Sequence, residues 1–372
     1  MNKQTRYLLY GILFIAAFTA SAVLLGEIFA PKDSVLSPHI EPVKEQTLPL
    51  VSAHTFPFEH TTVTITVPIN SSVYLGAQKA DKSVTVFGNV SENVWLADSY
   101  RSMVNDPAQD EFYNDLTGEL RNVRNSRNLS DDEYIELMSV FVQSLRYETI
   151  AENPAKFPIE TVMDGAGDCD DKSLLLAGLL SHEGYSVVLL SFVPESHMAA
   201  GVGSSDYLYK NSGYSFVETT NFSFIGVPTT TLNGGFDLKS DPIIIPIGTG
   251  TKVYQSGNAT RDISDAYEIA GKKAEEMEPQ VKALDRDLER KHAEISDLEN
   301  RMTAMRNSGD ILGYNTQVPV HNALTSEYNT GLARYHQAFS RYQKYAEVHN
   351  YILLHEFDRR GVYEYVKANL PA

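Results

Sequence analysis

Residues 165–180 read Gly-Ala-Gly-Asp-Cys-Asp-Asp-Lys-Ser-Leu-Leu-Leu-Ala-Gly-Leu-Leu, and this stretch decides the fold of the central part of the chain. Aspartate ahead of a long apolar run is a helix start signal, and Gly184 suits the C-terminal cap of the same helix. We therefore expect a buried helix with Cys169 in its first turn.

Cys169 is the only cysteine among 372 residues, so it cannot form a disulfide within the chain. In the first turn of a helix, unpaired N–H groups and the positive end of the dipole favour a thiolate over a thiol. The neighbouring Asp168, Asp170 and Asp171 oppose this effect, so a reactive thiol would need a second activating group. A metal site at these aspartates is a weaker interpretation than helix capping, because they lack the alternating ligand spacing of a calcium loop.

Three strands are expected downstream of this helix. Residues 186–193 read as a buried strand, His197 opens a second strand after a Pro-Glu-Ser turn, and residues 214–220 form a third. If the strands pair, His197 on one and Glu218 on the next become neighbours. A nucleophile at a helix start, a base on a strand and a carboxylate on the next strand is the arrangement of thiol acyl-transfer enzymes.

Three sequence blocks carry a family resemblance: Gly-Asp-Cys-Asp-Asp-Lys-Ser at Cys169, Ser-His-Met-Ala-Ala-Gly-Val at His197 and Tyr-Ser-Phe-Val-Glu-Thr-Thr at Glu218. In this order they resemble the transglutaminase-like superfamily of papain-type thiol enzymes, closest to its membrane-associated archaeal and bacterial branch. The resemblance covers roughly residues 110–245. It implies Cys169 as nucleophile, His197 as general base and Glu218 as the group that orients the imidazole. The superfamily's usual acid is aspartate, and Asp206 in the hairpin before the third strand is the reserve candidate.

The N-terminal segment Tyr7–Gly26 contains no charge and is long enough to cross a hydrocarbon core of about 30 Å. Lys3 and Arg6 precede it, which keeps the N-terminus cytoplasmic and sends the bulk of the chain to the extracytoplasmic side. The alternative is a cleaved signal peptide ending at Ala20-Ser21-Ala22. We favour a single-pass transmembrane anchor because apolar residues continue past that point.

The net charge of the chain limits the classes of partner that it can bind. The chain has 31 lysines and arginines against 48 aspartates and glutamates, a net charge of −17. This balance repels nucleic acid and anionic membrane surfaces. No basic patch or phosphate-binding glycine loop stands out, so we expect neither a nucleic-acid partner, nor a cofactor, nor a metal.

The region before the core reads as a linker over residues 31–52, followed by strands at 61–67 and 83–87 that form a small β layer. A capping box at Ser130 then opens a helix that we expect to run to Tyr147. Gln143 on this helix could donate to an oxyanion, but an exposed surface glutamine is the preferred interpretation. The backbone N–H of Cys169 is the better oxyanion donor.

The C-terminal third has a strict seven-residue period on each side of a turn at residues 307–310. Before the turn the series is Val281, Leu288, Ile295 and Met302, and the intervening positions are Leu284, Leu298 and Met305, with Lys291 as the polar intrusion. After the turn the series is Tyr314, His321, Tyr328, Tyr335, Tyr342 and His349. Such periods predict a coiled-coil hairpin of two helices, with Pro319 in the first turn of the second. The same seams could serve a coiled-coil partner or a homo-oligomer.

The sequence thus predicts an α+β protein with a papain/transglutaminase-like core, an N-terminal transmembrane helix and a C-terminal α-helical coiled-coil hairpin. The expected regions are 1–30 (anchor), 31–110 (linker and small β region), 111–250 (core) and 251–372 (hairpin and C-terminal segment). The expected function is acyl transfer on amide or peptide bonds of a protein or peptide substrate, by hydrolysis or transamidation. The alternative is a non-catalytic cell-envelope scaffold or binding protein with the same fold.

Overall fold

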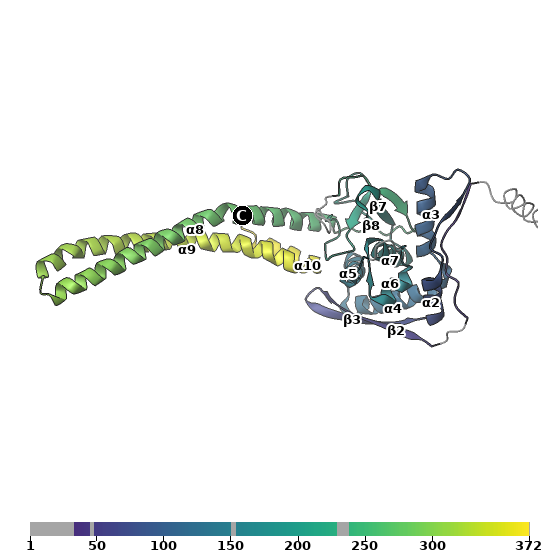
Figure 1. The fold of residues 1–372 in the computed structure, drawn as a ribbon, viewed down its shortest axis with the longest axis horizontal. Coiled ribbons are helices and arrows are strands. Elements are labelled where there is room, and N and C mark those ends of the chain that lie inside the picture. Colours follow the sequence, from purple (N-terminus) through teal and green to yellow (C-terminus); the bar gives the residue numbers. More distant parts are fainter. Residues whose placement is uncertain (1–32, 45–47, 150–153, 229–237, 372) are drawn as a thin grey trace, which may run out of the picture.

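The structure is a computed structural model that describes residues 33–44, 48–149, 154–228 and 238–371. A compact body of helices and strands carries a long rod of two helices (Figure 1). The mixed α+β class and the helical C-terminal region expected from the sequence are confirmed.

One face of the body is a β-hairpin of β2 (Leu50–Phe58) and β3 (Thr61–Ile69), paired antiparallel. The period-two pattern predicted for residues 61–67 is confirmed, because the inward side chains of β3 are buried and the others are exposed: Val63, Ile65, Val67 and Ile69. β3 contacts α4 (Asp110–Arg127), and β2 contacts α5 (Asp131–Ser144). The hairpin thus covers one side of the helical layer.

Helices form the middle layer, with α7 (Cys169–His182) at its centre (Figure 1). The other helices of the body are α2 (Ser71–Lys79), α3 (Glu92–Val104), α6 (Pro158–Asp164) and the short η1 (Pro107–Gln109). Both flanks of residue 110 contribute to one apolar core, in which Val104 and Leu116 join Leu175. The predicted helix from Cys169 to a Gly184 cap is confirmed, since Gly184 has φ +80° directly after α7.

The opposite face is a four-stranded antiparallel sheet in the order β10-β7-β8-β9. Its strands are β7 (Val187–Phe192), β8 (His197–Gly203), β9 (Tyr214–Val217) and β10 (Ile243–Pro246). A turn of η2 (Val193–Glu195) and Ser196, which has φ +49°, joins β7 to β8. Because this turn is so short, Phe192 pairs with His197 and the histidine begins its strand at the edge of the site.

Some predicted elements differ in extent or partner. The helix from Ser130 ends at Ser144, because Leu145 is extended and β5 (Arg146–Tyr147) pairs in parallel with β6 (Ala166–Gly167). The predicted strand at 83–87 is β4 (Thr85–Phe87), which pairs with β1 (Ser34–Leu36) and not with β3. Part of the expected linker, from Leu50 onward, belongs to β2. In each case, pairing with a segment distant in sequence determined where the element ends or which strand it joins.

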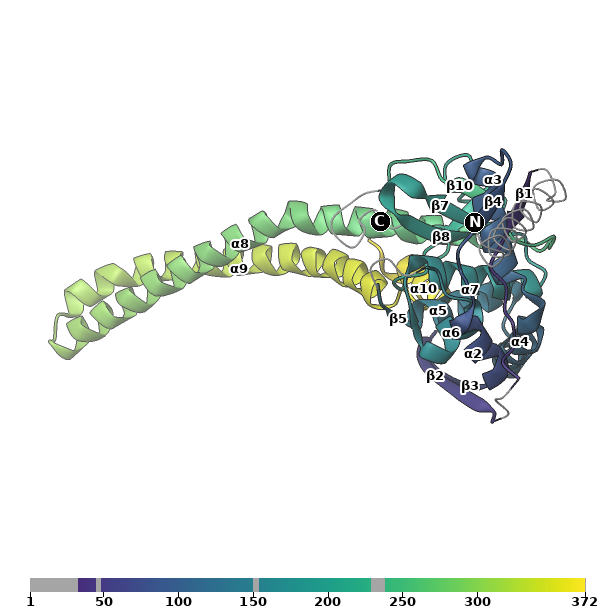
Figure 2. The same ribbon diagram turned by 45° about the vertical axis from the view of Figure 1, so that its right-hand side comes forward.

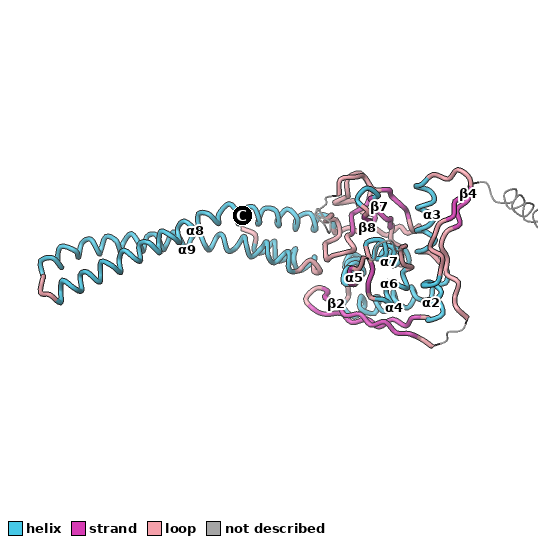
Figure 3. The backbone as a smooth tube through the Cα atoms, in the orientation of Figure 1, coloured by secondary structure: helices cyan, strands magenta, loops and turns pink. Residues whose placement is uncertain are grey.

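The rod is a helical hairpin of α8 (Gly257–Asn307) and α9 (Ile311–Leu354), which run antiparallel and lie side by side (Figures 2 and 3). The first predicted heptad series faces α9, since Val281, Leu288 and Met302 are buried. Pro319 lies inside α9 and not in its first turn, so that prediction is wrong. The helix begins earlier because the side chain of Asp310 accepts from Gly313 N at 2.9 Å and caps it.

The base of the rod is joined to the body by a second apolar cluster and by a buried ion pair. The cluster combines Ile263 of α8 and Val348 of α9 with Val362 of α10 (Arg359–Asn369) and with Phe224 of the loop after β9. Nearby, Glu136 of α5 lies 2.5 Å from Arg359 and accepts from Tyr254 at 2.8 Å. The rod is therefore anchored to the body at its base, through side chains near the start of α8 and near the end of α9.

The predicted membrane anchor Tyr7–Gly26 lies outside the described residues. Within the part of the chain that the structure describes, no helix combines the length and the apolar character needed to cross a bilayer.

Candidate functional site

The first turn of α7 is fixed by a reciprocal set of hydrogen bonds. Asp168 Oδ1 accepts from the N–H groups of Asp170 (3.1 Å) and Asp171 (3.2 Å), and Asp171 Oδ2 accepts from Asp168 N (3.2 Å). Gly167 must be glycine, because a Cβ there would lie 2.6 Å from the Asp171 Cβ. Asp168 and Asp171 thus form a capping box that holds Cys169 at the helix start.

The thiol of Cys169 is largely enclosed, with 8% of the residue exposed. It donates to Asp170 Oδ1 at 3.5 Å and lies 4.0 Å from Ser196 O, the carbonyl immediately before His197. The other oxygen of Asp170 accepts from the Tyr100 hydroxyl at 3.2 Å. The sulfur therefore sits between the acidic cap of α7 and the turn that begins the histidine strand.

Electrostatics at this position favour the protonated thiol. Burial and the Asp170 and Asp168 carboxylates raise the pKa of Cys169, and a backbone hydrogen bond at Met198 opposes them only in part. The helix dipole alone therefore does not activate the sulfur, which agrees with the inference that a second activating group is needed.

His197 and Glu218 meet although they come from different strands. His197 Nε2 lies 3.6 Å from Glu218 Oε2, and the two residues are 9% and 1% exposed. Glu218 Oε1 accepts from Thr219 N (3.0 Å), Thr220 N (2.8 Å) and Thr220 Oγ1 (2.6 Å). These three donors fix the carboxylate so that its second oxygen is turned toward the imidazole.

Asp206, the reserve acid, does not take this place. Its carboxylate accepts from Ser205 Oγ at 3.2 Å in the hairpin between β8 and β9. Of the two candidate acids, Glu218 is the one that the structure places beside His197. Glu218 lies just beyond the end of β9.

Gln143 is neither exposed nor available as an oxyanion donor, which corrects both sequence interpretations. It is 4% exposed, and its Nε2 donates to Glu218 O at 2.8 Å and to Ser223 O at 3.0 Å. Both amide hydrogens are thus used to hold the backbone around Glu218. The sequence around Gln143 could not reveal this, because the acceptors lie 75 and 80 positions further along the chain.

Two residues that sequence reasoning missed connect the three candidate residues. Ser173 Oγ donates to Met198 O at 3.2 Å and lies 3.0 Å from Thr219 Oγ1, so it joins the neighbours of His197 and of Glu218. Lys172 is fully buried on the same helix turn. The only available signal was a lysine and a serine at the head of an otherwise apolar helix.

No group of three or more acidic, histidine or cysteine side chains that could hold a metal is found among the described residues. The aspartates near Cys169 point to different protein partners, as their hydrogen bonds show.

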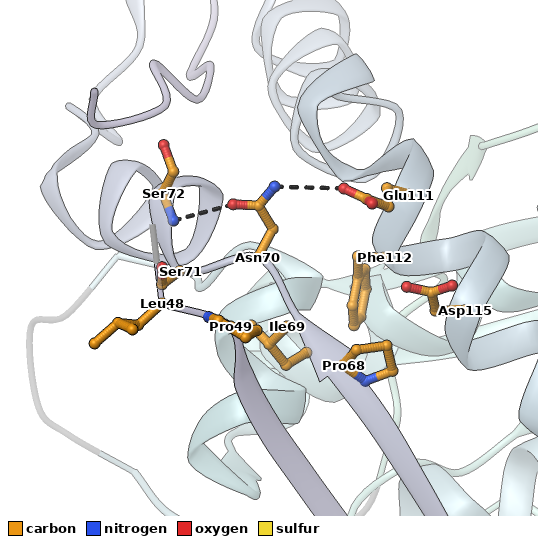
Figure 4. Close-up of a pocket in the computed structure, with 10 residues that line it drawn as sticks. All are labelled: Leu48, Pro49, Pro68, Ile69, Asn70, Ser71, Ser72, Glu111, Phe112 and Asp115. Atoms are coloured by element: carbon orange, nitrogen blue, oxygen red, sulfur yellow. Dashed lines mark hydrogen bonds between the residues drawn. The ribbon is translucent and has the colours of Figure 1, made fainter. Parts of the chain in front are cut away.

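A separate pocket of about 450 Å³ lies between the start of α2 and α4 (Figure 4). Asn70 caps α2 at Ser72 N (3.1 Å), and its amide reaches Glu111 Oε2 at 3.4 Å. None of the residues lining this pocket belongs to the site around Cys169.

Comparisons of this chain with protein-family models, with curated proteins and with solved structures found no match.

Proposed function

We propose that the protein is a thiol enzyme that acts on amide bonds, with Cys169 as nucleophile, His197 as general base and Glu218 as the orienting acid. The observation that carries the proposal is the buried His197–Glu218 contact of 3.6 Å, formed beside a thiol at a helix start. Sequence resemblance to the transglutaminase-like superfamily supports the same assignment. The apolar segment Tyr7–Gly26 supports a membrane-anchored, extracytoplasmic form of this enzyme.

The proposed reaction has two halves. The Cys169 thiol gives its proton to His197, and the sulfur attacks the amide carbonyl carbon. The C–N bond then breaks, the leaving amine takes the proton from the imidazolium, and a thioester remains. Water or a second amine gives a proton to His197 and attacks the thioester; the C–S bond breaks and the thiolate recovers the proton. Water yields hydrolysis, and an amine yields transamidation.

Glu218 acts on the ring and not on the substrate. A carboxylate at His197 Nε2 favours the tautomer that keeps a proton on that nitrogen, which leaves Nδ1 free to accept the thiol proton. The negative charge also stabilises the imidazolium formed in each half-reaction.

The backbone N–H of Cys169 is the proposed oxyanion donor. Asp168 Oδ1 already takes the N–H groups of Asp170 and Asp171, and Asp168 O takes that of Lys172. Among the described residues no acceptor is found for the N–H of Cys169 itself. A donor next to the nucleophilic sulfur is well placed for charge that develops on the attacked carbonyl.

The pH profile of Cys169 alkylation by iodoacetamide tests the proposal, because the chain holds a single thiol. A thiolate–imidazolium pair should keep the wild-type protein reactive well below the free-thiol pKa of about 8.5. His197→Ala should move reactivity to higher pH, and Cys169→Ala should abolish labelling. If the wild-type profile follows a simple thiol titration at or above 8.5 and His197→Ala does not change it, the enzyme assignment fails.

A binding or scaffold protein is the second candidate, favoured by the enclosure of the thiol and by the raised pKa of Cys169. In that case the buried polar residues around Cys169 would stabilise the fold, and the helical rod would hold a partner. The alkylation profile separates the two functions.

A further inference from the structure

Lys172 carries a buried charge, and it takes no part in the reaction steps proposed above. It lies one turn along α7 from Cys169 and is fully buried. Its Nζ donates to Leu145 O (2.8 Å), Gln143 O (3.2 Å) and Thr220 O (3.3 Å). Two of these carbonyls belong to the C-terminal end of α5, where backbone acceptors lack partners within the helix and a cation is favoured.

Backbone carbonyls are dipoles and do not neutralise a full charge, so a buried ammonium also needs an opposite charge nearby. Glu218 meets this need. Burial lowers the pKa of Lys172 to about 8, and attraction by Glu218 acts against that lowering. The two residues are therefore opposite charges enclosed in the same interior, one on α7 and one after β9.

The same helix turn also fixes the backbone that carries Glu218. Lys172 holds Thr220 O, and Ser173 meets Thr219 Oγ1 at 3.0 Å. Thr220 in turn supplies two of the three donors to Glu218 Oε1. A chain of contacts thus runs from the helix of the nucleophile to the acid without passing through the sheet.

We propose that Lys172 is a positioning residue, which holds the segment after Glu218 in place and supplies the positive charge that keeps the Glu218 carboxylate ionised beside His197. This inference rests on the proposed function. A protonated Glu218 could no longer accept from the imidazolium or stabilise its charge, so reactivity of Cys169 would fall where Glu218 takes up a proton. Removing the Lys172 charge should raise the pH at which that happens.

The test is the alkylation profile of Cys169 in the full chain, from about pH 4 to about pH 10. In Lys172→Met the acidic limb should move upward by about one pH unit, which slows alkylation roughly tenfold at a pH on that limb. Lys82→Met is the matched control, because Lys82 Nζ also pairs with a mostly buried carboxylate, Glu160, at 2.9 Å but lies apart from the site. Its acidic limb should coincide with that of the wild type.

A second variant covers loss of folding. If Lys172→Met does not fold, Lys172→Met/Glu218→Gln should fold, because no uncompensated charge remains buried; circular dichroism measures both. An unshifted acidic limb in folded Lys172→Met would overturn the proposal. A double variant that stays unfolded would also overturn it, because the role of Lys172 would then lie in its hydrogen bonds to the carbonyls and not in its charge. Failure of the proposed function looks different: the wild type itself would show no thiol reactive below about pH 8.5.

Discussion

Two lysines interrupt otherwise apolar helix faces in this protein, and their surroundings differ. Lys291 in the rod lies 3.5 Å from Asp287 and 3.4 Å from Glu327 of the facing helix, at the edge of the seam. Lys172 in the body donates to three backbone carbonyl oxygens and has no contact with solvent. The rod places charge where water can still reach it, whereas the body encloses charge next to its candidate site.

The rod and the body are stabilised by different kinds of contact. Contacts in the rod repeat with the heptad, and exposed charges pair along or across it, as His321 pairs with Glu299 at 3.0 Å. Contacts in the body join elements that are distant in sequence, and they leave buried polar groups that depend on one another. We therefore expect substitutions to have large, coupled effects around α7 and small, local effects along α8 and α9.

The largest effect is expected for Glu218→Gln. Glutamine keeps the shape of the side chain but not the charge that stabilises the imidazolium, so turnover on an amide substrate should fall roughly 10²- to 10⁴-fold. Circular dichroism should show a native fold at low temperature, with a lower melting temperature than wild type because Lys172 then lacks its buried counter-charge. Turnover within a few-fold of wild type would mean that the buried contact with His197 has no catalytic role.

A second prediction sets the body against the rod in stability. Ser173→Ala leaves Met198 O without its donor and Thr219 Oγ1 without its partner, so the free energy of unfolding should fall by about 1–3 kcal/mol. Lys291→Met removes only partly exposed ion pairs and should change it by less than about 1 kcal/mol. Chemical denaturation measures both. Equal losses would show that the two regions are not organised differently.

The third prediction concerns the thiol. Asp170 raises the pKa of Cys169, so Asp170→Asn should lower that pKa, increase the thiolate fraction at neutral pH and speed alkylation several-fold. Asp297→Asn in the rod is the control, since Asp297 is exposed, pairs with Arg301 and lies outside the candidate site. A slower reaction in Asp170→Asn would indicate that this carboxylate assists the thiol and does not suppress its ionisation.

A smaller effect is expected in the pH dependence of stability. Burial and Asp168 raise the pKa of Asp171 to about 6, above its ordinary value of 3.8. The folded state therefore binds more protons than the unfolded state between these values, and the contribution of Asp171 to stability is full below about 3.8 and lost as pH rises through about 6. Asp171→Asn should flatten this part of the stability curve in denaturation series. A curve of unchanged slope would assign the dependence to other groups.

The smallest effect is expected from shortening the rod. Gly271 lies against His349 and Leu288 against Gly331, so residues 282 and 338 are nearly opposite each other. Replacing residues 282–338 by a short glycine-rich turn keeps the base of the rod. Cys169 alkylation should then stay within about twofold of wild type, since no contact of the site comes from the removed part. A larger change would show that the distal rod acts on the site.

Sequence reasoning succeeded where the signal was local. The heptads of α8 and α9 and the start of α7 at Cys169 follow from neighbouring residues. The strand order also predicted that His197 and Glu218 would be neighbours. The roles of Lys172 and Gln143 could not be predicted. Their acceptors lie between 27 and 80 positions away, so only tertiary structure brings donor and acceptor together. The end of α5 could not be predicted for the same reason. It is set by the pairing of β5 with β6, which lies 20 positions further along the chain.

The length of the rod can be changed without altering the contacts at its base. Its base is held by the cluster of Ile263, Val348 and Val362, while beyond that base α8 and α9 pack against each other. With 51 residues, α8 is about 75 Å long at 1.5 Å per residue. One heptad added to each helix would extend the hairpin by roughly 10 Å and return the same faces to the seam. Insertions and deletions in matched sevens would thus change how far the tip stands from the body while the surroundings of Cys169 stay the same.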